Sequence, residues 1–222
     1  MANSPAQRAQ YLAALGIDAW VPRRQPAQPP VAALDWDALR SAVALCTRCE
    51  LCTTRTQTVF GVGDPRARWL VIGEAPGEEE DRQGEPFVGA AGQLLDRMLQ
   101  AIDLPRAAVF IANMLKCRPP GNRNPLPQEL ASCRPYLQRQ IELLQPALIL
   151  VVGRIAAQSL LGTHLSVARL RGQVPSFGER NTPLVVTYHP AYLLRTPGDT
   201  RKAWEALNIA RQTFLRLTAV QQ

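Results

Sequence analysis

Four continuous apolar runs, separated by helical stretches, restrict the possible folds of this 222-residue chain more than any other feature. The runs occupy residues 69–72, 109–115, 147–152 and 184–188. Because they are continuous rather than alternating, they are typical of strands buried on both faces, as in parallel sheets. Helical patterns occupy residues 92–102, 128–144, 154–161 and 200–217. This order predicts an α/β three-layer sandwich in which helices cover both faces of a central four-stranded parallel sheet.

The N-terminal part of the chain follows a different pattern. Within residues 1–20 we expect a short amphipathic helix that carries Tyr11, Leu12, Leu15 and Ile17. Residues 21–30 contain four prolines, which is typical of a semi-extended linker. Asp35 is suited to cap the next helix. We therefore expect a helical and proline-rich extension over residues 1–34 and a catalytic domain over residues 35–222.

Composition limits the location and the partners of the chain. No apolar run approaches the ~20 residues of a membrane span, and the N-terminus lacks the pattern of a secretory signal, so we expect a cytoplasmic protein. The net charge is +7, from 25 Lys and Arg against 18 Asp and Glu. This excess favours a polyanion as partner, because guanidinium groups pair with phosphates. Charge alone does not separate DNA from RNA or from a basic surface.

The cysteines form two groups, Cys46-x2-Cys49 and Cys117-x15-Cys133. In a cytoplasmic chain, cysteines indicate metal ligands rather than disulfides. Four thiolates can hold zinc or an iron–sulfur cluster, and the spacing does not choose between them. Cys52 either replaces one of the distant ligands or is a buried free thiol.

Polar side chains follow three of the predicted strands. Glu74 follows the first, Asn113 lies at the end of the second, and His189 follows the last. Each residue alone is more typical of a cap or a turn. In a parallel sheet, however, ligands bind beyond the carboxyl ends of the strands. The coincidence of the three therefore predicts a functional site at this edge.

Three motifs carry a resemblance to a known family: GEAPGEEEDRQGEPFVGAAGQLLDRML, NMLKCRPPGNRNPLPQEL and HPAYLLR. They resemble family 4 uracil-DNA glycosylases, the bacterial and archaeal type with a [4Fe-4S] cluster, and the similarity runs from about residue 45 to residue 217. The resemblance implies base excision repair: uracil is flipped out of DNA and its N-glycosidic bond is hydrolysed without strand cleavage. It also implies a cluster held by Cys46, Cys49, Cys117 and Cys133, with zinc as the alternative metal.

The resemblance also implies a uracil-binding site. Its members are Gly73, Glu74, Ala75, Glu80, Phe87, Asn113 and His189. Phe87 corresponds to the aromatic that stacks on the flipped base, Asn113 to the residue that reads O4 and N3–H, and Glu80 to the residue that crowds C5. Glu74 and His189 are the expected catalytic residues. His189 donates a hydrogen bond to uracil O2, and Glu74 either orients the attacking water or only shapes the pocket.

Contacts to DNA are expected from six further residues: Arg118, Arg123, Leu193, Leu194, Arg195 and Arg201. The resemblance implies that the cluster holds the segment of Arg118 and Arg123 on the domain, so that these arginines lie beside the DNA. Both leucines are expected to be exposed and to fill the space left by the flipped nucleotide from the minor groove, or else to form the apolar start of a helix. Arg195 and Arg201 are expected to bind phosphates.

The N-terminal segment resembles a docking peptide. Arg8, Leu15-Gly16-Ile17, Trp20 and Arg23-Arg24 are similar to the N-terminal peptide of the psi subunit of the bacterial clamp loader, which binds the chi subunit. The resemblance implies a chi partner through residues 8–24, and the alternative is a helix packed on the catalytic domain. The enzyme is expected to be a nucleoid-associated monomer. The alternative function is a non-catalytic iron–sulfur DNA-binding accessory protein of the replication machinery.

Overall fold

The computed structural model describes residues 5–17 and 30–219, in two units that span Met1–Pro30 and Val31–Gln222. The described part of the first unit is helix α1 (Pro5–Ala14), the three residues after it, and Pro30. Tyr11, Leu15 and Ile17 are exposed there. The predicted anchor Trp20 and the pair Arg23-Arg24 lie outside the described residues.

The second unit contains, among its described residues, a six-stranded sheet with the order β1-β3-β2-β4-β6-β5. The central four strands run parallel. They are β2 (Trp69–Gly73), β3 (Val109–Asn113), β4 (Leu148–Val152) and β6 (Thr182–Thr187). The predicted four-stranded parallel sheet is therefore confirmed. Two short strands, β1 (Val62–Gly63) and β5 (Ser176–Phe177), pair antiparallel at its edges.

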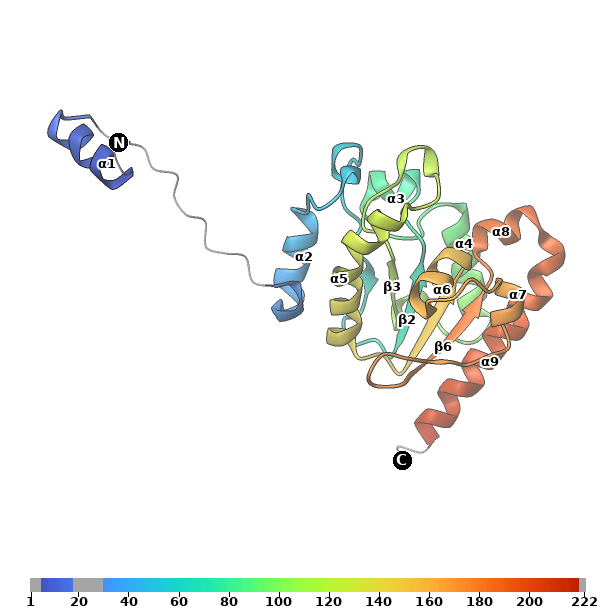
Figure 1. Ribbon diagram of the computed structural model, residues 1–222. Helices are drawn as coiled ribbons and strands as arrows, with labels where there is room; N and C mark the ends of the chain where they lie inside the picture. Colours follow the sequence, from blue (N-terminus) through green and yellow to red (C-terminus); the bar gives the residue numbers. More distant parts are fainter. Residues whose placement is uncertain (1–4, 18–29, 220–222) are drawn as a thin grey trace. The chain divides into compact units, whose positions relative to one another are not determined.

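Helices cover both faces of this sheet, as Figure 1 shows. Alternate strand residues enter different clusters: Leu70 and Ile72 pack with one layer, Trp69 and Val71 with the other. The first layer consists of α2 (Trp36–Ala44), α5 (Pro127–Leu144), α6 (Arg154–Leu161) and α7 (Val167–Leu170). The second consists of α4 (Ala90–Gln100), α8 (Pro190–Arg195) and α9 (Thr200–Ala219). Strands apolar on both faces require this three-layer arrangement.

Helix boundaries follow local chemistry. The Oδ1 atom of Asp35 accepts a hydrogen bond from the backbone N of Ala38 at 2.9 Å, which confirms the predicted cap of α2. Pro127 opens α5, where a missing N–H costs nothing. The same helix continues through Pro135. Helix α3 (Glu78–Gln83) and the short 3-10 helices Val31–Ala33, Glu50–Thr53, Arg106–Ala108, Pro120–Asn122 and Pro197–Asp199 complete the unit.

No helix among the described residues is long and apolar enough to cross a membrane.

Candidate active site

The carboxyl ends of the four parallel strands assemble the site. Gly73 ends β2 and lies opposite Asn113, which ends β3. Beyond β4 lies Gly153, and beyond β6 lies His189, the N-terminal cap of α8. A β-carbon added to Gly153 would lie 3.2 Å from Cβ of His189. The strand ends therefore bring together residues that are distant in sequence.

Gly73 is the point at which Phe87 and Asn113 meet. A β-carbon at this position would lie 2.4 Å from Oδ1 of Asn113 and 2.6 Å from Cζ of Phe87. Real β-carbons do not approach other atoms so closely, so glycine is required here. The side chains of Phe87 and Asn113 thus both reach the space next to Gly73.

Asn113 carries an acceptor without a partner. The side chain is buried, with 2% exposure, and its Oδ1 atom has no hydrogen-bond partner among the described residues. An unsatisfied buried amide oxygen costs on the order of 1–3 kcal/mol. Buried polar atoms of this kind are rare and often mark a function. A ligand that brings an N–H group to this oxygen would remove the cost.

The backbone of Phe87 is strained. Its φ is 56°, in the left-handed region that large side chains avoid. A β-carbon at Gly92 would lie 1.8 Å from the carbonyl oxygen of Phe87. The first turn of α4 therefore packs directly against the Phe87 backbone, and Gly92 makes that approach possible.

Glu80 holds the loop on which Phe87 lies. Its Oε1 atom accepts hydrogen bonds from the backbone N of Val88 at 2.9 Å and of Gly89 at 3.2 Å, and Oε2 accepts one from Gly77 N at 3.1 Å. Charged acceptors make strong hydrogen bonds. The carboxylate thus connects the turn after β2 with the segment after Phe87, in addition to its predicted position near the base.

His189 is held in one tautomer. Its Nδ1 atom accepts a hydrogen bond from the backbone N of Ala191 at 3.1 Å, so the ring hydrogen is on Nε2. The ring lies 5.6 Å from that of Phe87, between centroids. Burial lowers the pKa of His189 to about 4, and the nearby Arg195 acts in the same direction. His189 is therefore a neutral donor at neutral pH.

Glu74 is a half-buried carboxylate beside the strand ends. Burial raises its pKa, and the charge of Arg154 partly opposes that rise. Arg154 is a residue that the sequence interpretation missed. The available signal was its position directly after β4, the one central strand to which no polar residue had been assigned.

The cysteines meet on the α2–α5 side of the sheet. Cys46 and Cys49 follow α2, Cys117 follows β3, and Cys133 lies in α5. All five cysteines of the chain, including Cys52, are free thiols. Burial raises the pKa of Cys117, and the charges of Cys49 and Cys46 raise it further. Burial also raises the pKa of Cys133 to about 12, with added contributions from Cys117 and Cys46. Cys117 and Cys133 belong to the buried cluster of this layer, and Cys46 and Cys49 pack against it.

This set of donors fits a metal cluster in its chemistry. Arg55 Nη1 donates to Cys117 Sγ at 3.0 Å and Lys116 N donates to Cys133 Sγ at 3.2 Å, the kind of contact that supports thiolate ligands. Within residues 5–17 and 30–219, no three Cys, His, Asp or Glu side chains already stand in an arrangement that holds a metal ion. The chemistry of the donors therefore fits a cluster, and the ligand set implied by the family resemblance stays a prediction.

The expected DNA wedge requires a correction at Leu193. This residue was expected to be exposed, but it is 2% exposed and packs in the core beside α4 and α9. Consecutive residues of a helix point about 100° apart, and Leu194 lies outside this contact and is 49% exposed. Leu194 is therefore the wedge candidate that remains at the surface, next to the exposed Arg195.

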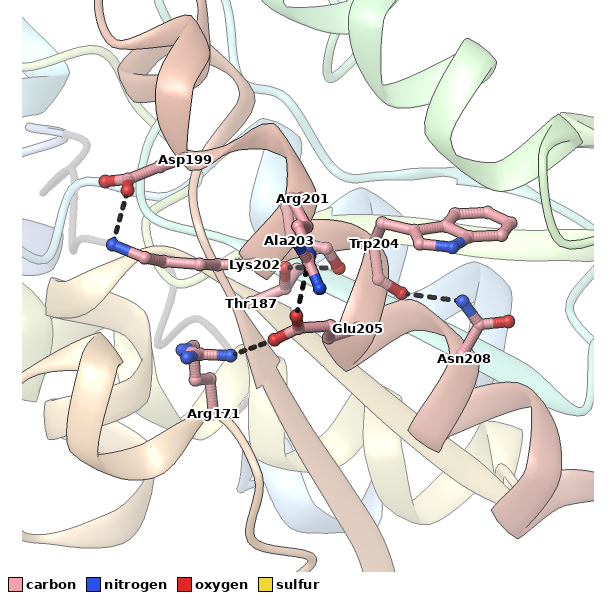
Figure 2. A network of polar contacts seen from close by, with 9 residues as sticks. All are labelled: Arg171, Thr187, Asp199, Arg201, Lys202, Ala203, Trp204, Glu205 and Asn208. Atoms are coloured by element: carbon pink, nitrogen blue, oxygen red, sulfur yellow. Dashed lines mark hydrogen bonds and ion pairs between the residues drawn. The ribbon is translucent and has the colours of Figure 1, made fainter.

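A network of polar contacts holds the start of α9 (Figure 2). Glu205 pairs with Arg171 at 2.8 Å and with the exposed Arg201 at 3.5 Å. Asp199 accepts from Lys202 at 2.7 Å and from the Tyr192 hydroxyl at 2.6 Å. Since Tyr192 belongs to α8, these contacts tie the HPAYLLR segment to α9.

The two arginines near the cysteines already have partners. Arg118 pairs with Glu78 at 3.4 Å, which joins the segment after Cys117 to α3. Arg123 forms a bidentate ion pair with the buried Glu129: Nη2 donates to Oε1 at 2.6 Å and Nη1 to Oε2 at 2.9 Å. Such paired guanidinium groups are less available for phosphates, so the role of Arg123 in DNA binding stays a prediction.

Comparisons with known proteins identify the family to which this chain belongs. A family model described as the uracil DNA glycosylase superfamily matches residues 60–208. A type-4 uracil-DNA glycosylase from Archaeoglobus fulgidus is 42% identical over 177 residues, which cover 77% of this chain and 88% of that protein. The chain therefore belongs to the type-4 uracil-DNA glycosylase family. The predicted resemblance is confirmed.

Other relatives place the chain within this superfamily. A type-4 uracil-DNA glycosylase from Thermotoga maritima is 42% identical over 154 residues, covering 69% of this chain and 80% of its own length. A type-5 uracil-DNA glycosylase from Thermus thermophilus is 36% identical over 118 residues, covering 46% of this chain and 53% of its own length. The type-4 relatives thus share more of the chain than the type-5 relative does.

Substitution of Gly92 by alanine tests the contact between α4 and Phe87. Alanine is the better helix former by about 1 kcal/mol, but its β-carbon would lie 1.8 Å from the Phe87 carbonyl oxygen. We expect the clash to dominate, so that Gly92→Ala displaces the loop and weakens binding of free uracil in calorimetry. Gly198→Ala is the control, because a β-carbon there meets nothing within 4 Å. Equal uracil binding by both variants would contradict the account.

The burial of neutral His189 predicts a pH dependence of stability. Between pH 6.5 and about 4, the unfolded chain binds a proton at this histidine and the folded chain does not. The free energy of unfolding should therefore fall as the pH falls through this window. His189→Gln should remove this part of the slope, measured by urea unfolding at several pH values. The exposed His164 is the control, and a slope lost with His164→Gln instead would refute the assignment.

Proposed function

We propose that this protein is a uracil-DNA glycosylase that removes uracil from DNA in base excision repair and leaves an abasic site. The buried, unpartnered Oδ1 atom of Asn113 beside Phe87 is the observation that carries the proposal. Uracil presents an N–H group at N3 and can stack on an aromatic ring. Both features match what the strand ends offer.

Recognition of uracil over cytosine follows from the same atom. The Asn113 oxygen accepts from N3–H of uracil while the amide nitrogen donates to O4. Cytosine has an acceptor at N3 and a donor at C4, so it would leave these groups unpaired. Sites built on hydrogen bonds discriminate strongly for this reason. Glu80, which clamps the loop, also limits the space near C5 and so disfavours thymine.

His189 acts on the departing base. Cleavage of the N-glycosidic bond places negative charge on uracil, and the Nε2–H group of the neutral imidazole donates to O2 as this charge develops. The hydrogen bond from Ala191 N to Nδ1 supports this orientation. A preorganised donor of this kind contributes roughly 3 kcal/mol.

Glu74 lies nearest to the deoxyribose in the proposed complex. As a carboxylate it would stabilise the positive charge on the sugar and orient the attacking water. Arg154 favours the ionised form of Glu74 against the effect of burial. Ala75, next in the chain, offers no side-chain group for this task.

Both lysine amines of the chain already have partners, which bears on strand cleavage. Its two lysines are Lys116 and Lys202. The Nζ atom of Lys116 is buried and donates to two acceptors, and Lys202 pairs with Asp199. A Schiff base with the sugar would require one of them to leave its partners. We therefore infer base removal without cleavage of the strand.

We infer that Cys46, Cys49, Cys117 and Cys133 hold a [4Fe-4S] cluster. Four gathered thiols and the N–H groups that reach two of them support this assignment, and zinc is the alternative metal. When bound, the cluster would supply cross-linking between α2, α5 and the segment after β3. Arg118 directly follows Cys117 in this region. DNA beyond the pocket would be contacted by Leu194, Arg195 and Arg201. We also infer that the enzyme acts as a monomer on nucleoid DNA in the cytoplasm.

An oligonucleotide assay tests the activity. The protein should make a uracil-containing strand break after alkali but not before it, because excision leaves an alkali-labile abasic site. His189→Ala should lower the single-turnover rate about 10²- to 10³-fold, with His164→Ala as the unaffected control. Absence of alkali-dependent breakage on single-stranded, U:G and U:A substrates would refute the function and leave the non-catalytic DNA-binding alternative.

We further propose that residues 8–24 bind the chi subunit of the clamp loader. Exposed Tyr11, Leu15 and Ile17 on one short segment support a docking role. Purified chi should capture the full chain but not a chain that starts at Val31, the first residue of the second unit. Leu15→Ala should reduce capture, while Gln10→Ala, at an exposed polar position of α1, should not. Equal capture of the full and shortened chains would refute the proposal.

A further inference from the structure

Lys116 is buried three residues after Asn113, the residue proposed to read uracil, and its side chain donates no hydrogen bond to a carboxylate. The side chain is 1% exposed. Its Nζ atom donates to the backbone carbonyl of Asn113 at 3.0 Å and to Oε1 of Gln140 at 2.6 Å. Gln140, itself fully buried in α5, donates through Nε2 to the carbonyl of Phe60 at 2.9 Å. Burial of an amine costs free energy unless hydrogen bonds compensate it, and here the carbonyl of Asn113 is one of the two acceptors that do so.

Both backbone polar groups of Lys116, the N–H and the carbonyl, also have hydrogen-bond partners. Its N–H group donates to Cys133 Sγ at 3.2 Å, and its carbonyl accepts from Val59 N at 2.8 Å. The residues between Asn113 and Lys116 bond to the neighbouring loop: Met114 N donates to Gly73 O and Leu115 N to Glu74 O. The segment therefore connects the cysteine site, the end of β3 and the loop of Glu74.

We propose that Lys116, anchored by Gln140, is a positioning residue that holds the end of β3 so that the Asn113 amide faces the base. The bond is made to the backbone of Asn113, and thus Lys116 acts through Asn113 rather than on uracil. The amine carries an N–H group for both acceptors whether or not it is protonated. The arrangement also explains why Lys116 directly precedes Cys117: one short segment carries both the cysteine ligand and the anchor of the recognition residue.

This inference rests on the proposed uracil excision and predicts a specific defect. Lys116→Met keeps the length of the side chain and removes both hydrogen bonds. We expect Kd for free uracil, measured by calorimetry, to rise about tenfold, with an unchanged Kd for DNA that contains an abasic site and offers no base to Asn113. The visible absorption of the cluster should stay that of the parent chain. An unchanged Kd for uracil, or an equal loss of affinity for abasic DNA, would overturn the inference.

A double-mutant cycle separates positioning from general stability. If Lys116 acts through Asn113, then Lys116→Met should lower the excision rate in the parent chain and add no further loss in an Asn113→Ala background. The same fold-loss in both backgrounds would indicate a merely structural role. Failure of the parent chain to excise uracil would refute the proposed function instead, so the two failures are distinguishable.

If Lys116→Met does not fold, a second variant tests whether Lys116 positions Asn113. Gln140→Leu removes the anchor of Nζ while the bond to Asn113 can persist, so a smaller rise in Kd for uracil is expected, again without a change for abasic DNA. Gln138→Leu is the matched control, because Gln138 is exposed on the same helix. A Gln140→Leu chain that binds uracil as tightly as the Gln138→Leu chain would overturn the inference.

Discussion

The parallel pairing of β2 with β3 places Gly73 opposite Asn113, and the rest of the site depends on this pairing. The absence of a side chain at Gly73 leaves the space that Phe87 and the Asn113 amide occupy. A shift of one residue in register would send every side chain of one strand to the opposite face. Burial of β2 and β3 on both faces by two helical layers opposes such a shift, so the core of the protein also fixes the geometry of the site.

The site itself contains strain that nearby groups offset. The left-handed backbone of Phe87 costs on the order of 1–3 kcal/mol. Three backbone hydrogen bonds to Glu80 hold the flanking turns, and each contributes about 1.5–3 kcal/mol when the acceptor is charged. The unsatisfied oxygen of Asn113 is a further cost. The hydrogen bonds to Glu80 thus offset strain in the residues that surround Gly73.

Much of the fold was predictable because continuous apolar runs and helix periodicity are local properties. The four parallel strands and the cap at Asp35 follow from such patterns. The edge strands β1 and β5 were not predictable, since two-residue strands are defined by their partners and not by their own sequence. The exposure of Leu193 was also predicted wrongly, because it depends on which face of α8 meets α4 and α9.

The sequence predicted which residues at the strand ends belong to the site, but it did not predict the contacts between the side chains there. Glu74, Asn113 and His189 could be placed on one edge from strand order alone. That Glu80 bonds the Phe87 loop, that Arg154 lies beside Glu74, and that Arg123 pairs with Glu129 depends on side-chain packing between distant segments. No spacing in the sequence encodes these contacts. Local patterns therefore locate the chemistry, while tertiary packing decides which side chains are free to perform it.

The most direct test of the account is the structure of the protein crystallised with free uracil. The account predicts that N3 of uracil lies about 2.9 Å from Oδ1 of Asn113, that the base stacks on Phe87, and that O2 faces Nε2 of His189. Uracil bound elsewhere, or an Asn113 oxygen already paired with another protein group in the complex, would contradict it.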